Sequence, residues 1–88
     1  MAKASKRRLN FEIIGGNLSE AIEELENIRD RASKGELNEA DFQIRLLHAY
    51  HHLNFAWNIR NVPTSQYAKL TDEQFERWGK YPSEIETL

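Results

Sequence analysis

Hydrophobic residues recur at three- and four-residue steps in two long segments of the chain, and a short polar stretch separates the two. In residues 18–32 the apolar positions share one face of a helix, and the many glutamates lie on the other side. In residues 39–60 the apolar positions cover nearly the whole circumference. The pattern predicts two long helices, the second of which has to be covered on more than one side.

Local signals mark the ends of these helices. Asn17 or Ser19 is expected to cap the first helix, and Gly35 to follow its last turn, where glycine adopts a left-handed conformation at little cost. Asn38 is expected to cap the second helix, with Asp41 at the third helical position. Because the connection is so short, the two helices must run antiparallel as a helical hairpin.

A short third helix is expected near the C-terminus. Pro63 disfavours helical geometry in the preceding residue, and residues 67–70 can hold a single helical turn after it. Thr71 and Gln74 have the spacing of a capping box, and Gly79 supplies a stop signal. The predicted fold class is therefore all-α, an antiparallel helical hairpin with a short third helix.

The chain is expected to form a single helical domain over residues 17–82, followed by a short tail at residues 83–88. Residues 1–16 are predicted to be a flexible basic arm that includes a short extended segment at residues 9–14, ended by a glycine pair. A domain of this size buries only about 60–65% of the surface that its unfolded chain exposes, which favours association with a partner.

The second helix carries two apolar faces, and each needs a cover. The face expected to pack on the first helix consists of Phe42, Leu46, Ala49, Tyr50, Leu53, Ala56 and Trp57. The candidate interaction face consists of Ile44, Leu47, His48, His51, Phe55 and Ile59. Either the third helix or a second subunit can cover this face, so a monomer and a homodimer stay equally open.

Composition and charge narrow the classes of function. The chain has no cysteine, which removes disulfides and thiol catalysis. Four of the first eight residues are basic, but the acidic first helix and the net charge of -2 argue against nucleic-acid binding. No apolar run approaches the roughly 20 residues of a membrane span, and the basic start leads into no signal-peptide core, so a cytoplasmic protein is expected.

Polar side chains of the second helix form a further candidate site, for an anion or another small ligand: Arg45, His52, Asn54, Asn58 and Arg60. The competing interpretation is that the cations pair with glutamates of the first helix and that the amides cap a helix or face water.

Two of the three histidines have a spacing that suits metal binding. His48 and His52 are four residues apart on a helix, so their imidazoles can share a metal ion. Residues 42–71 contain no acid or cysteine that could complete a site, and no metal ligands are assigned.

The sequence contains no catalytic triad, no phosphate-binding glycine loop and no cofactor motif, so neither an enzyme nor a bound cofactor is expected. The leading hypothesis is a small non-catalytic module for protein–protein interaction or assembly, with a protein partner or a second copy of the chain. The alternative is a small ligand- or metal-binding domain that uses His48, His51 and His52.

Overall fold

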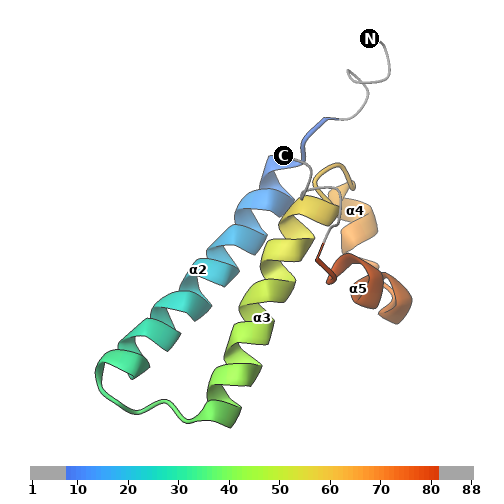
Figure 1. Ribbon diagram of the computed structural model, residues 1–88. Helices are drawn as coiled ribbons and strands as arrows, with labels where there is room; N and C mark the ends of the chain where they lie inside the picture. The colour runs from blue at the N-terminus through green and yellow to red at the C-terminus, as the bar shows by residue number, and fades with distance from the viewer. Residues whose placement is uncertain (1–7, 82–88) are drawn as a thin grey trace.

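A computed structural model describes residues 8–81, and this part of the chain is helical, without strands. Its helices are α2 (Phe11–Ser33), α3 (Glu39–Asn58), α4 (Thr64–Tyr67) and α5 (Asp72–Trp78). The long helices α2 and α3 run antiparallel, and the short helices lie beside the open end of this hairpin (Figure 1). The predicted all-α helical hairpin with a short third helix is confirmed. None of the helices described has the length and apolar character required to cross a membrane.

The largest departure from prediction concerns the start of α2. The sequence predicts an extended segment at residues 9–14 and a helix capped by Asn17 or Ser19, and both predictions are wrong because α2 begins at Phe11. The glycine pair lies inside the helix and does not break the chain. Residues 11–16 are therefore part of the first long helix.

Asn10 explains why the helix begins this early. Its side-chain oxygen accepts a hydrogen bond from the Ile13 backbone amide (3.2 Å), as a helix cap does. Its own backbone amide donates to the Arg60 carbonyl (2.6 Å), and its side-chain amide donates to the Val62 carbonyl (2.8 Å). The residue that starts α2 is therefore fastened to the segment that follows α3.

The remaining boundaries follow local signals closely. The Asn38 side chain accepts from the Asp41 amide (2.8 Å), and Thr71 and Gln74 form both hydrogen bonds of a capping box, so these caps are confirmed. The single helical turn expected at residues 67–70 lies three residues earlier, directly after Pro63. The arm and tail predicted for the ends of the chain fall mostly on residues 1–7 and 82–88, outside the described residues.

The hydrophobic core lies at the open end of the hairpin. Ile13 of α2 packs there with Phe55 and Ile59, and Val62, Tyr67 and Trp78 pack against these three residues. Along the middle of the hairpin the buried strip between the helices is narrow. Ala21 and Ala49, each only 1% exposed, lie at its centre. The small side chains let the two helices approach closely but contribute little apolar volume.

Substitution of the helical glycines tests the early start of α2. Nothing lies within 4 Å of a Cβ placed on Gly15, so Gly15→Ala should raise the free energy of unfolding by about 0.5–1 kcal/mol, the usual gain for alanine in a helix. Chemical denaturation monitored by circular dichroism measures this change.

Gly35→Ala is the matched control, because Gly35 has a φ of 67°. The same substitution there should lower the free energy of unfolding by about 1–2 kcal/mol. A Gly15→Ala protein that is no more stable than the wild type would contradict the assignment of residues 11–16 to α2.

Candidate functional site

On the face of α3 that was expected to pack on α2, only the small residues are fully buried. Ala49 and Ala56 are buried, whereas Phe42, Tyr50 and Leu53 stay 40–53% exposed. The prediction therefore fails for these three large side chains, whereas Leu46 and Trp57 of the same face are half-buried. The strip that touches α2 lies roughly a quarter of a turn around α3 from the three exposed side chains, since each residue advances the helix by about 100°.

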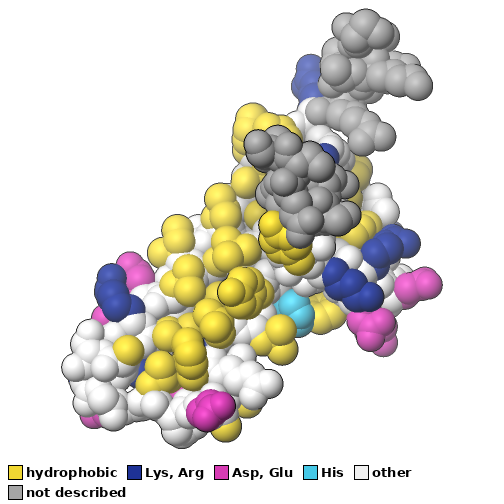
Figure 2. Space-filling model, in the orientation of Figure 1, with side chains coloured by type: hydrophobic (Ala, Val, Ile, Leu, Met, Phe, Trp, Pro, Cys, Tyr) yellow, Lys and Arg dark blue, Asp and Glu magenta, His cyan; other side chains and the backbone are white. Residues whose placement is uncertain are grey.

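Helix α2 shows the same offset. Leu18, Ile22 and Leu25 follow its apolar stripe, yet each is 39–55% exposed. Figure 2 shows hydrophobic side chains gathered along α2 and α3 on one side of the molecule, with charged groups toward the margins. We call this surface the apolar face: Leu18, Ile22, Leu25, Phe42, Tyr50 and Leu53.

The apolar face is continuous across the two helices. An open groove of about 280 Å³ joins Ile14 of α2 to Leu53 and Trp57 of α3. A smaller groove of about 240 Å³ is lined by Leu46, Leu47 and Tyr50 farther along α3. The surface therefore extends over most of the length of α3.

The structure divides the candidate interaction face into a covered part and an open part. Phe55 is only 3% exposed, and Ile59 is fully buried in the core of the same chain. The Phe75 ring of α5 lies 5.3 Å from the Phe55 ring and 5.4 Å from the His51 ring, measured between centroids. The third helix therefore covers this part of α3, and Phe55 and Ile59 are unavailable to a partner.

The other members of that face are open to solvent. Ile44 and Leu47 are exposed, as is His48. Helix α5 has only seven residues and contacts the later part of α3, so it does not extend to this end.

The two asparagines of the candidate ligand site hold α5 in place. Asn54 donates to the Gly79 carbonyl (2.6 Å), and Asn58 donates to the carbonyls of Trp78 (2.6 Å) and Lys80 (2.9 Å). Carbonyls at the end of a helix lack partners within the helix, so these amides satisfy them. The interpretation that the amides cap a helix is confirmed.

The structure does not bring the five polar candidates together. The Arg60 guanidinium stacks over the Trp57 ring at 3.8 Å and donates to the Trp57 carbonyl (2.7 Å), at the end of α3. Arg45 and His52 instead face α2. The predicted pairing of Arg45 with a glutamate of the first helix is confirmed, because Arg45 Nη1 donates to Glu24 Oε2 at 3.2 Å.

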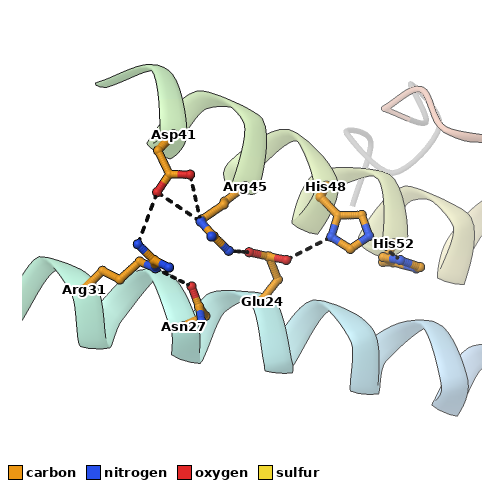
Figure 3. Close-up of polar contacts among 7 residues, drawn as sticks. All are labelled: Glu24, Asn27, Arg31, Asp41, Arg45, His48 and His52. Atoms are coloured by element: carbon orange, nitrogen blue, oxygen red, sulfur yellow. Dashed lines mark hydrogen bonds and ion pairs between the residues drawn. The ribbon is translucent and has the colours of Figure 1, made fainter. Parts of the chain in front are cut away.

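Glu24 is the centre of a polar seam between the two long helices (Figure 3). Its side chain is only 15% exposed and accepts from both Arg45 Nη1 and His48 Nδ1, the latter at 3.0 Å. The His48 hydrogen bond, with help from Arg45, lowers the pKa of Glu24. Arg45 Nε also contacts both carboxylate oxygens of Asp41 at 3.0 and 3.1 Å, which raises the Arg45 pKa together with the Glu24 contact.

The seam continues along α3 as a chain of rings and amides. The Nε2 atoms of His48 and His52 lie 3.1 Å apart, and His52 Nδ1 lies 2.8 Å from Asn17 Oδ1. The buried Asn17 amide donates in turn to the Ile13 carbonyl (3.0 Å). Burial, followed by the neighbouring His48, lowers the pKa of His52.

Sequence reasoning missed the two residues of α2 that orient the histidines. Asn17 and Glu24 face α3, and so does Arg31, which contacts Asp41 at 3.7 Å. These three residues are spaced by seven positions, which is two turns of a helix, and this spacing is the signal that could have identified them.

Within residues 8–81 no group of three or more histidine, aspartate or glutamate side chains is arranged to hold a metal ion. Comparison of the chain with protein-family models, with curated proteins and with solved structures finds no match.

Stability in mildly acidic solution should depend on His52. Its pKa is lower in the folded chain than its ordinary value of 6.5, so the unfolded state binds more protons in this range. The full free energy of unfolding is present above about pH 6.5. Part of it is lost as the pH falls through the pKa that His52 has in the folded chain. The charged or titratable groups near His52 are His48, His51, Glu20 and Glu24. The lowered pKa of Glu24 changes stability only below pH 4.5, its ordinary pKa, so it does not affect this range.

The melting temperature at fixed protein concentration should therefore fall by several degrees between pH 7.5 and pH 5.5. In His52→Gln, which keeps an amide donor for Asn17, most of that fall should disappear. Equal pH profiles for the two proteins would contradict this role of His52.

Proposed function

We propose that this chain is a small assembly module that pairs with a second copy of itself through the apolar face. The observation that supports the proposal is the set of six large apolar side chains, each 39–55% exposed, that lie together on one side of two packed helices. An apolar surface of this kind on a small chain is typical of a protein–protein contact.

The chemistry of the face suits contact between two identical surfaces. None of its six residues is charged, so these side chains do not repel each other across two copies. Arg60 lines the adjoining groove, where it stacks on Trp57 of its own chain. Tyr50 supplies an aromatic side chain of the kind enriched at interfaces. Two antiparallel hairpins stacked face to face produce a four-helix bundle, a stable architecture that needs no rearrangement of either hairpin.

The size of the face also fits a dimer. Together with Trp57, which lines the groove beside Leu53, the apolar surface runs about 22 Å along α3 from Phe42, and two adjacent helices are about 20 Å wide. Two copies would together bury roughly 900 Å² over this footprint, before any rim residues are counted. This area approaches the roughly 1,000 Å² expected of a biological interface, which the surrounding residues can complete.

Sedimentation equilibrium tests the proposal directly. The wild-type chain should sediment with twice the chain mass at micromolar concentration. Ile22→Glu and Tyr50→Glu should each weaken association by about 100-fold or more, because burying an unpaired carboxylate costs about 3 kcal/mol or more. Both side chains are more than half exposed, so the separated chains should retain their helical circular dichroism signal.

Ile44→Glu is the matched control. Ile44 is an apolar residue of α3 that is even more exposed, but it lies on the side of the helix away from the apolar face. This variant should dimerise as the wild type does. A monomeric wild type, or a dimer that Ile44→Glu disrupts and Ile22→Glu does not, would refute the proposed interface.

A further inference from the structure

The imidazoles of His48 and His52 are each held by a single well-defined acceptor on α2. The Glu24 carboxylate can only accept, so His48 Nδ1 carries the proton of their 3.0 Å hydrogen bond. The Asn17 amide nitrogen is occupied by the Ile13 carbonyl, so its oxygen accepts from His52 Nδ1. Both rings therefore have Nδ1 as the donor atom.

This assignment leaves the two Nε2 atoms facing each other at 3.1 Å. In neutral rings with a proton on Nδ1, each Nε2 presents a lone pair. Two lone pairs at this distance repel each other unless a positive centre, either a proton or a metal ion, lies between them.

We propose that the two Nε2 atoms form a binding site for a divalent transition metal, with Zn²⁺ as the best-fitting ion. Two Zn–N bonds of about 2.0–2.1 Å at a tetrahedral angle place the nitrogens about 3.3–3.4 Å apart, so a small movement of the rings admits the ion. Imidazole nitrogen is a preferred ligand of zinc, and water supplies the remaining positions. The site has two protein ligands and binds more weakly than a complete structural zinc site.

The surroundings of the pair are compatible with a bound metal ion. The Glu24 and Asn17 oxygens hold the Nδ1 protons as the outer-shell acceptors of metal-bound histidines usually do, and they fix the orientation of each ring. The lowered pKa of His52 keeps its Nε2 available as a ligand near neutral pH. Glu20 lies close enough to favour positive charge on His52.

Solvent can reach the histidine pair, and the third histidine lies outside the site. His48 is exposed, and an open pocket of about 230 Å³ lined by Glu20 and Tyr67 reaches His52 from the other side. His51 does not take part, because its ring packs edge-on against Phe75 of α5. The site thus uses two of the three histidines that the sequence offers.

Zinc sulfate titrated into EDTA-treated, ¹⁵N-labelled protein tests the proposal. Long-range ¹H–¹⁵N spectra should show the Nε2 signals of His48 and His52 shifting together and saturating near one equivalent, while the His51 signals stay in place. His48→Ala and His52→Ala should each weaken binding by about 10-fold or more.

His51→Phe is the matched control, because it keeps a ring against α5 and removes both nitrogens. It should bind zinc as the wild type does. If zinc leaves the Nε2 signals of both histidines unchanged while acid titrates them, a proton alone occupies the gap and the proposal is wrong. Loss of binding in His51→Phe, in a protein that keeps its helical signal, would also overturn it.

Discussion

Two helices packed side by side bury only the strip along which they touch, and the rest of this structure follows from that constraint. The strip between α2 and α3 has alanines at its centre, so it brings the helices together without enclosing much apolar volume. Ile13, Phe55 and Ile59 form a core at the open end, where side chains of α4 and α5 pack against them. Toward the connecting loop the described residues supply no third element, and apart from the buried Ile28 most large apolar side chains remain at the surface.

Where apolar packing is thin, the polar seam sets the register between the helices. Glu24 accepts from Arg45 and His48, which lie one turn apart on α3. Sliding one helix by a turn would separate these partners and leave a poorly exposed carboxylate unpaired, which is unfavourable. The more exposed pair of Arg29 and Asp30 contributes little by comparison. The seam therefore selects one arrangement of the hairpin from several that the alanines would allow.

Features that depend on neighbours within about four residues could be predicted from the sequence. The caps at Asn38 and Thr71 and the left-handed Gly35 are of this kind, since the side chain and its backbone partner lie in the same turn. The start of α2 could not be predicted because Asn10 is fastened to carbonyls about fifty residues away. These contacts and the burial of Ile13 outweigh the cost of two helical glycines, about 1 kcal/mol each.

The candidate site was predictable in its residue types but not in their partners. An apolar pattern that surrounds α3 does not specify which strip faces α2, because that choice depends on Asn17, Ala21 and Glu24 on the other helix. Likewise, Ile44 and Phe55 belong to one predicted face. Phe55 is buried because Ile13 and the short helices pack around it at the open end, whereas Ile44 lies beyond their reach and is exposed.

The apolar face and the histidine pair lie on different sides of α3, and this separation has a structural consequence. In a bundle made by stacking two hairpins on their apolar faces, each polar seam points away from the second copy. The Nε2 atoms of His48 and His52 then stay open to solvent in the dimer as they are in the single chain. The proposed dimer interface and the proposed metal site thus use separate atoms, and neither needs the other. A metal ion on the seam would act within one hairpin, on the same side chains that fix its register.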